Sequence, residues 1–426
     1  MNFSGIIHQF HRSKASLYAR YLIGVLLLVY CYIQALKGGD FRIYMGAADL
    51  LRTGQNCYNE WIHLSGDNYG QYSYSPFFAT LLIPFTYLPK GSAEFLFLVA
   101  NLFFIKRILR FLKIRLQVQK LSIVQQYAWA FLTLILSIRF ALHNFEMVQM
   151  TIFLLFCCIE ALHQAQQKRY WLSGLLLSLG IVIKILPLVM LPYFLFRKHW
   201  QPLFYFLLFM ALFMFTPALF FGFEINHLLL HDWWEIINPN NTQFIAEQNK
   251  FGDGIHSLSA LLAAYFSDTP SFWGIENARI IKVLSQEQLS LFLSSLRLLF
   301  VVFTIYFLRT LPFQKAKSKG HEIWELSYIL AVVPLIFPHQ QKYAFFFLLP
   351  AIATIAFVFV QQKMAKQKWI VLLLSLFFLL AVFTTDGIIG KELSRLSQHY
   401  KTITFGTFCL IAALALSKNK FLNSKQ

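Results

Sequence analysis

Long apolar runs separated by mostly short polar segments dominate this chain and limit the folds open to it. A helix needs about 20 apolar residues to cross the hydrocarbon core of a bilayer, and fewer where protein surrounds part of it. The stretch 76–89 is apolar but short and bounded by prolines, so it reads as an interfacial or re-entrant helix. The sequence therefore predicts an all-α, polytopic membrane protein. About 12 spanning helices are expected, at 17–36, 92–112, 121–141, 148–164, 170–184, 186–197, 201–222, 288–310, 323–337, 341–361, 368–385 and 402–418.

The composition also indicates a membrane environment. Hydrophobic residues make up 58% of the chain and charged residues only 13%, whereas about a quarter of a soluble globular chain is charged. A water-soluble protein cannot hide so much apolar surface, so the bilayer has to act as the solvent. No attached soluble domain and no internal repeat is visible, and we expect residues 1–426 to form a single integral membrane domain.

The net charge of +18 raises the question of nucleic-acid binding. Basic nucleic-acid-binding proteins concentrate Lys and Arg on a soluble face or in a groove. Here Lys and Arg fall in short clusters between apolar runs, which is typical of loops kept on the cytoplasmic side. We therefore expect no nucleic-acid partner and place both termini in the cytoplasm. The expected cytoplasmic clusters are 12–20, 106–120, 168–169, 197–198, 309–319, 363–368 and 418–425.

The apolar segment 170–196 has two interpretations. Two short helices that turn between Lys184 and Pro187 keep Arg197 and Lys198 on the cytoplasmic side. A single long helix kinked at Pro187 would place that pair outside, against the charge rule. We expect the two short helices. The large outward segments are then 37–75 and 223–287, with shorter ones at 142–147, 338–342 and 386–401.

A carboxylate follows the first expected span, in Gly38-Gly39-Asp40. An acidic residue at a membrane boundary is often only solvated. The paired glycines favour a functional role, because glycine lets the backbone approach another element closely.

The first outward segment is rich in aromatic side chains. Such side chains usually anchor a protein at the membrane interface, although rings that face a cleft can stack on a sugar, and sequence does not separate the two roles. Ser75 and Pro76 look like a helix start, with Ser75 as N-cap and Pro76 at the first helical position. The aromatic residues of interest here are Tyr44, Tyr58 and Tyr74.

Lys184 is the only Lys or Arg within 170–196. A charged residue in a membrane span is costly, so it usually pairs with another group or lines a polar cavity. The alternative is that its ammonium group extends to the interface. Pro187 can begin the next short helix, and a lysine beside a helix N-terminus makes an anion site that suits a phosphate.

Two more polar patches are expected at the same level. The turn 338–343 contains His339 and Lys342, and His339 can donate to a phosphate or relay a proton, although a lone loop histidine is more often only polar surface. The short loop 143–146 is followed by Gln149 and Thr151 in the next expected span.

Taken in order, these pieces resemble glycosyltransferase family 87, within the C-type superfamily that uses polyprenyl-phosphate sugars. The resemblance covers most of the chain, in order and in topology. Two elements depart from the family pattern and leave the acceptor and the sugar open. Where the family often has Gly-Gln-x-Asn, this chain has Val148-Gln149-Met150-Thr151. Where the family commonly has Asn-Gln-Ser, this chain has Gly254-Ile255-His256-Ser257. The matching elements are Asp-x-x-x-Tyr at Asp40 and Tyr44, Gly-then-Tyr in 51–58, Tyr-x-Pro at Tyr74, Lys-x-x-Pro at Lys184, and Ser-Leu at Ser257.

The resemblance implies transfer of a hexose, typically mannose, from a polyprenyl-phosphate sugar to a hydroxyl of a glycolipid or glycan, with inversion at the anomeric carbon. Such a reaction needs a base near the acceptor and cations near the donor phosphate. Asp40 is the expected base and Lys184 the expected phosphate ligand. No metal-ligand cluster is evident, and we expect neither a metal nor a cofactor. Further expected contacts are Arg42, His339 and Lys342 for the phosphate, and Tyr44, Tyr58, Tyr74, Gln149 and His256 for the substrates.

Two other classes of membrane protein are alternatives to a glycosyltransferase. A lipid-linked oligosaccharide flippase or transporter would place ionisable residues near the bilayer midplane, often in paired halves, whereas the polar groups here gather at one face. A polysaccharide polymerase or ligase would rely on Arg and His in the large outer loop, but 223–287 is mainly acidic and aromatic. We expect a multi-pass enzyme of the plasma (inner) membrane with an extracytoplasmic active site.

Overall fold

The fold is almost entirely helical. It is known here from a computed structural model, in which the only strands of the described part are β1 (Trp61–Ser65) and β2 (Asn68–Gln71), paired as one antiparallel hairpin. Parts of the expected basic clusters, at 12–13, 309–311, 363–366, 419–420 and 422–425, lie outside the described residues, as do 239–251, 269–270, 272 and 276–278 of the expected outward segment 223–287. The structure describes residues 14–65, 68–238, 252–268, 271, 273–275, 279–308, 312–361, 367–418 and 421.

The N-terminal part folds as a long helix followed by short amphipathic elements. Helix α2 (Lys14–Lys37) ends at two glycines, Gly38 and Gly39, whose φ angles of +80° and +50° turn the chain sharply into α3 (Phe41–Arg52). Helix α4 (Pro76–Leu82) starts as predicted, because the Ser75 hydroxyl accepts a hydrogen bond from the Phe78 N–H at 3.3 Å and Pro76 occupies the first turn. The 3-10 helix η1 (Ile83–Tyr87) continues it, so 76–89 is a short helical segment.

The prediction of two short helices in 170–196 is confirmed. Helix α8 (Tyr170–Ile183) stops where Lys184 adopts an extended backbone, with φ −150° and ψ 132°. The 3-10 helix η3 (Leu186–Val189) then contains Pro187 and leads into α9 (Met190–Phe196). The break leaves Lys184 outside any regular helix.

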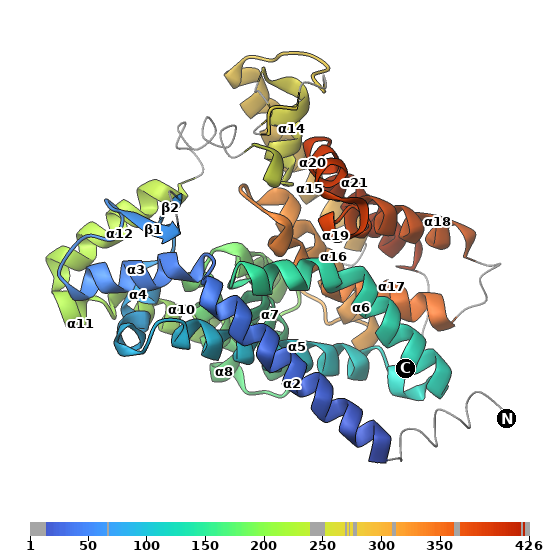
Figure 1. The fold of residues 1–426 in the computed structure, drawn as a ribbon. Helices are drawn as coiled ribbons and strands as arrows, with labels where there is room; N and C mark the ends of the chain where they lie inside the picture. Colours follow the sequence, from blue (N-terminus) through green and yellow to red (C-terminus); the bar gives the residue numbers. More distant parts are fainter. Residues whose placement is uncertain are drawn as a thin grey trace.

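The remaining elements are helical as well. Figure 1 shows α14 and α20 together at the top of the view, and α12 beside the β1–β2 hairpin on one flank. These elements are α5 (Ser92–Arg115), η2 (Val118–Lys120), α6 (Ile123–Glu146), α7 (Thr151–Gln166), α10 (Trp200–Phe215), α11 (Ala218–Phe221), α12 (Phe223–Ile237), η4 (Gly252–Gly254), α14 (Leu258–Phe266), α15 (Gln286–Leu308), α16 (Lys319–Ile336), η5 (Lys342–Leu348), α17 (Leu349–Gln361), α18 (Lys368–Phe377), η7 (Phe378–Val382), α19 (Asp386–Ile389), α20 (Lys391–His399) and α21 (Thr402–Leu416).

Several helices match the dimensions of a bilayer. Within the described residues, five are long and apolar enough to cross a membrane, and the bent pair α20 and α21 would make a sixth. Every expected span coincides with a helix. Some of these helices, such as α7 and α8, are too short to meet the length criterion. Helix α5 is long enough but carries Lys or Arg at five positions of its C-terminal half. The chain is therefore an all-α membrane protein, and the count of about 12 spans stays a prediction.

Burial separates a central helix from peripheral ones. In an 18-residue stretch of the continuous segment Lys342–Gln361, 89% of the residues are buried, whereas only 17% are buried in such a stretch of Ser16–Lys37, Trp200–Phe221 or Gln286–Leu308. A helix that is apolar all round is either enclosed by protein or surrounded by lipid. The three exposed apolar helices therefore face lipid, and the η5–α17 segment forms the protein core.

The polar groups of the bundle divide between two ends. At one end, which we name the site end, the turns around Asp40, Met147, Lys184 and 339–343 meet. The second large loop packs there too, because the His256 N–H donates to the Gln340 carbonyl at 2.9 Å. At the other end, which we name the basic end, α5, α7 and α9 terminate and α16 begins; it comprises residues 107–120, 160–169, 197–199 and 315–322.

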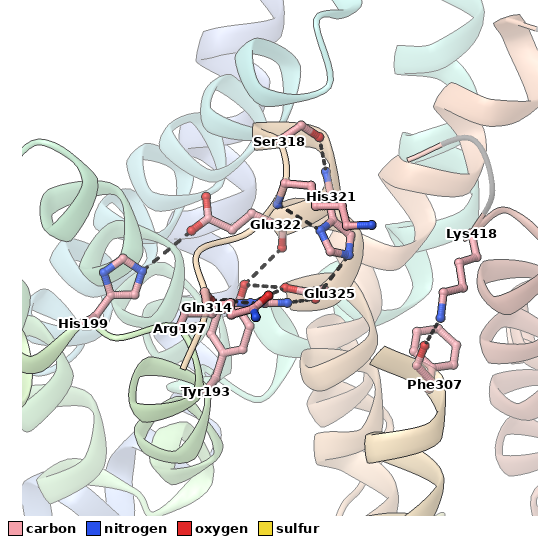
Figure 2. Close-up of polar contacts among 11 residues, drawn as sticks. Tyr193, Arg197, His199, Phe307, Gln314, Ser318, His321, Glu322, Glu325 and Lys418 are labelled. Atoms are coloured by element: carbon pink, nitrogen blue, oxygen red, sulfur yellow. Dashed lines mark hydrogen bonds and ion pairs between the residues drawn. The ribbon is translucent and has the colours of Figure 1, made fainter. Parts of the chain in front are cut away.

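A buried ion pair organises the basic end (Figure 2). The Arg197 guanidinium after α9 pairs with the Glu325 carboxylate of α16, and both side chains are almost completely buried. His321 Nε2 lies 3.2 Å from a Glu325 oxygen, and His199 Nε2 lies 3.8 Å from a Glu322 oxygen. This network holds Arg197 at the same end of the bundle as the start of α16. Two short helices in 170–196 require this position, because they return the chain to the end at which α8 begins.

Candidate active site

The turn between α2 and α3 is pressed against the turn that follows α6. The Asp40 N–H donates a hydrogen bond to the Met147 carbonyl at 2.9 Å. A Cβ atom on Gly39 would lie 2.4 Å from that carbonyl oxygen, so only glycine fits at this position without a shift of one turn. The paired glycines thus permit the predicted close approach between this turn and the backbone of Met147. This approach brings the Asp40 carboxylate to Gln149.

The Asp40 carboxylate is held in a partly buried position. Gln149 Nε2 donates to Asp40 Oδ2 at 2.5 Å. Burial raises the pKa of Asp40, and the hydrogen bond from Gln149 and the positive charge of Lys184 only partly offset that effect. A carboxylate with a raised pKa is a stronger proton acceptor. These properties suit the predicted role of Asp40 as a general base.

Two buried tyrosines connect this carboxylate to a cation. The Tyr44 hydroxyl donates to Gln149 Oε1 at 3.1 Å, and it lies 2.7 Å from the Tyr74 hydroxyl. Burial is the main cause that raises the pKa of Tyr44 well above its ordinary value, so its phenol stays protonated. Lys184 Nζ in turn donates to the Tyr74 hydroxyl at 3.2 Å. The result is a continuous hydrogen-bonded chain from Asp40 to Lys184.

Lys184 lies between aromatic rings. Its Nζ is 5.1 Å from the ring centroid of Tyr74 and 5.7 Å from that of Tyr343, distances at which a cation interacts with the face of an aromatic ring. Among the described residues it forms no ion pair with Asp or Glu, although the Asp40 charge is near enough to affect it. The half-buried ammonium group therefore retains its capacity to bind an anion.

The turn 339–342 closes the other side of this group. Burial, reinforced by the Lys184 charge, lowers the pKa of His339 to about 4, so the His339 ring is neutral near pH 7 and carries a single N–H. The charges that act on Lys342 are instead those of Arg139, Asp386 and Glu146. The structure thus brings His339, and not Lys342, close to Lys184.

Arg42 and Tyr58 take supporting positions. The Arg42 guanidinium donates to two backbone carbonyls, those of Leu64 at 2.6 Å and Leu36 at 3.0 Å, which fasten the hairpin to the end of α2. The Tyr58 hydroxyl donates to the Tyr74 carbonyl at 2.7 Å and is buried. Tyr58 therefore holds the backbone of Tyr74 in position.

His256 lies at the site end, where its backbone N–H donates to the Gln340 carbonyl. It is fully buried, and neither ring nitrogen has a hydrogen-bond partner within the described part of the chain. Burial lowers its pKa well below the ordinary value, and the charges of Lys401, Arg139 and Lys342 act in the same direction. The role of His256 as a substrate contact stays a prediction.

Two groups at the site end were not singled out from the sequence. Tyr343 supplies a ring beside Lys184 and stacks on His143 with ring centroids 5.7 Å apart. Arg139 donates to the Thr384 hydroxyl at 2.7 Å and to the Ala381 carbonyl at 2.8 Å, which fastens the end of η7 to α6. The conspicuous polar turn 338–343 was the only signal for Tyr343. Arg139 lies inside an apolar run, where a charged residue is itself a signal.

The described residues contain no group of three or more His, Cys, Asp or Glu side chains that could hold a metal ion. The candidate site instead consists of one carboxylate, one ammonium group, an imidazole, phenols and an amide.

Comparison with known families assigns the chain. The sequence profile of glycosyltransferase family 87 matches residues 72–316, more than half of the chain. The protein belongs to glycosyltransferase family 87. No curated protein matches it. The matched segment of this family 87 protein includes Tyr74, Gln149 and Lys184, whereas Asp40 and His339 lie outside it. Family membership, together with the apolar helices, makes the protein a membrane glycosyltransferase.

Proposed function

We propose that this family 87 protein transfers a hexose, mannose being the expected one, from a polyprenyl-phosphate sugar to an acceptor hydroxyl with inversion. The acceptor is expected to be a glycolipid or a glycan. The observation that carries the proposal is the chain of hydrogen bonds from Asp40 through Gln149, Tyr44 and Tyr74 to Lys184. It joins the proposed base and a cation in one hydrogen-bonded group.

Each end of this chain has a role in the reaction. Asp40 takes the proton from the acceptor hydroxyl as the acceptor oxygen attacks the anomeric carbon from the side opposite the phosphate. The bond between that carbon and the phosphate oxygen breaks, and its electron pair leaves with the polyprenyl phosphate. The negative charge on the phosphate grows in this step, so a fixed cation stabilises the transition state more than the ground state. Lys184 is that cation, and the His339 N–H assists it.

A polyprenyl donor suits the location of the group. The polyprenyl tail stays in the bilayer, so a cation at the ends of membrane helices can meet the phosphate without extracting the lipid. Lys184 terminates an apolar helix of 14 residues, and its ammonium group has no carboxylate partner among the described residues. An anionic phosphate would complete its coordination.

The proposed orientation follows from the distribution of basic residues. The cluster Arg107, Arg110, Arg115 and Lys120 and the residue Lys319 lie at the end of the bundle opposite Asp40. Since short basic loops resist translocation, we infer that the basic end is cytoplasmic and the site end extracytoplasmic. The expected location is the plasma (inner) membrane.

The donor class is tested with purified protein in liposomes. Labelled mannosyl-polyprenyl phosphate and labelled nucleotide-mannose are supplied separately, each with a crude glycolipid extract as acceptor. The proposal predicts label transfer from the polyprenyl donor only, with the opposite anomeric configuration in the product. Transfer from the nucleotide sugar alone, or retention of configuration, would overturn it.

A further inference from the structure

Two adjoining pockets open at the basic end, far from the Asp40 cluster. Their volumes are about 430 Å³ and about 550 Å³. Gln117 and Lys319 line both, so the two form one continuous depression between α5, α7, α9 and α16. We name this depression the basic pocket. Its Lys and Arg side chains are Arg107, Arg110, Arg115, Lys120, Lys319, Arg197, Lys198 and Lys315, and its carboxylates are Glu160 and Glu322.

Only part of this positive charge is neutralised by the protein. Arg107 Nη2 pairs with Glu160 at 2.8 Å, and Arg197 pairs with Glu325. Glu322 accepts a hydrogen bond from Gln166 and lies near His199. These contacts leave most of the cations without a carboxylate.

The unneutralised cations include three at the rim. Among the described residues, Arg110, Lys120 and Lys319 are exposed and form no ion pair and no side-chain hydrogen bond. Arg115 lies deeper and is 8% exposed; its guanidinium contacts Gln166 and the Phe111 ring. The pocket is therefore a preformed site for an anion.

The position of Arg110 on its helix indicates what kind of anion. At 100° per residue, Leu96, Phe103, Arg110 and Ile114 fall on one stripe of α5. The three apolar side chains of this stripe are exposed by 53%, 55% and 52%. A stripe of exposed apolar residues on a membrane protein faces lipid chains, so Arg110 extends from the lipid-facing surface into the pocket rim.

We propose that the basic pocket binds the headgroup of an anionic phospholipid. The phosphate lies among Arg110, Lys120 and Lys319, and the acyl chains follow the stripe past Ile114 and Phe103. Basic pockets between membrane helices bind the headgroups of anionic lipids. A soluble phosphate compound would match the charge but would leave the apolar stripe unused.

The test uses purified, delipidated full-length protein in a neutral detergent. Native mass spectrometry measures the affinity for phosphatidylglycerol and for phosphatidylcholine. Wild type is expected to prefer phosphatidylglycerol. The double variant Arg110→Gln with Lys319→Gln is expected to bind it about 30-fold more weakly, since two basic side chains are worth about 2 kcal/mol.

The matched control removes two positive charges from α5, the helix of Arg110, at positions outside the pocket. Lys106 and Lys113 are exposed on α5 and line neither pocket. The variant Lys106→Gln with Lys113→Gln is expected to keep the wild-type affinity. Equal losses in the two double variants would reduce the effect to general surface charge and overturn the proposal.

A competition arm separates the lipid from a free phosphate. Glycerol 3-phosphate and inorganic phosphate at millimolar concentration are added to the phosphatidylglycerol complex. Persistence of the complex supports a lipid site with acyl-chain contacts. Full displacement would assign the pocket to soluble phosphate and contradict the lipid proposal. Thermal unfolding gives a second readout, because a ligand that binds the native state raises the melting temperature. Phosphatidylglycerol is expected to raise the melting temperature of the wild type but not that of the variant Arg110→Gln with Lys319→Gln.

Discussion

Lys184 Nζ donates a hydrogen bond across 3.2 Å to the hydroxyl of Tyr74, a residue 110 positions earlier in the chain. The same ammonium group lies over the Tyr74 ring, with Nζ 5.1 Å from its centroid. Neutral aromatic partners hold the cation in place without cancelling its charge. The positive charge of Lys184 is thereby connected to Asp40 through hydrogen bonds of Tyr74, Tyr44 and Gln149.

Replacement of this cation tests its role towards the donor. In Lys184→Gln, kcat/KM for the polyprenyl-phosphate donor is expected to fall about 100-fold, because one preorganised electrostatic contact to the departing phosphate is lost. Donor affinity is expected to weaken as well, since the donor phosphate is already charged before reaction. Steady-state transfer rates at several donor concentrations measure both.

Lys90→Gln is the matched control for that variant. Lys90 is exposed in the turn before α5, close to the end of α2. It should keep wild-type rates. Unchanged donor affinity in Lys184→Gln would rule out the phosphate role of Lys184.

The pH dependence of transfer reports on the base. Activity is expected to fall as the pH drops through the pKa of Asp40, which burial raises above the ordinary carboxyl value. In Gln149→Met the hydrogen bond that stabilises the carboxylate is absent, so the pKa of Asp40 rises further. The acid limb of the kcat/KM profile should therefore move to higher pH in this variant.

The direction of that movement is decisive. An acid limb that stays at the wild-type position in Gln149→Met, or moves to lower pH, would show that a group other than Asp40 controls it.

The glycine turn before Asp40 gives a prediction about stability. In Gly39→Ala the new Cβ would lie 2.4 Å from the Met147 carbonyl oxygen, at a φ of +50°. A left-handed alanine alone costs about 1–2 kcal/mol, and the clash adds to it. We expect a lower melting temperature and reduced transfer. Gly24→Ala, within α2 and with no atom within 4 Å of its Cβ, should leave both unchanged. Equal behaviour of the two variants would contradict the packing of this turn.

The buried ion pair at the basic end gives a second stability prediction. Arg197→Met leaves the Glu325 carboxylate buried without its main partner, which typically costs about 3–5 kcal/mol. The double variant Arg197→Met with Glu325→Met removes both charges and should recover much of the loss. Melting temperatures in one detergent measure the series. A double variant as unstable as the single one would contradict the interpretation.

The helices could be located from the sequence because apolar runs and prolines are local signals. The break in 170–196 follows from Pro187 and from the basic pair Arg197 and Lys198, and the structure has it at Lys184. The β1–β2 hairpin and the helices within the large loop, such as α12, lack a comparable apolar signal. Their formation depends on tertiary contacts, for example the Asn56 amide to the Asp232 carboxylate at 2.7 Å.

Individual site residues were easier to name than their partners. Asp40, Tyr44, Tyr74, Gln149 and Lys184 were singled out, and the structure brings these five together. The sequence did not reveal that Arg42 binds backbone carbonyls, because the orientation of a side chain is decided by elements distant in the chain. Tyr343 was likewise hidden, since one tyrosine in a polar turn resembles any interfacial aromatic.

The most direct test of the account compares two aspartates of the same segment. Asp40→Asn and, as control, Asp49→Asn are purified and placed in liposomes with labelled mannosyl-polyprenyl phosphate and the glycolipid extract; Asp49 is exposed on α3 and pairs with Arg52 at 2.6 Å. Loss of a general base typically lowers the rate about 10²- to 10⁴-fold. The account predicts that loss for Asp40→Asn and normal transfer for Asp49→Asn. Transfer by a folded Asp40→Asn protein at the wild-type rate would contradict the central claim that Asp40 is the base.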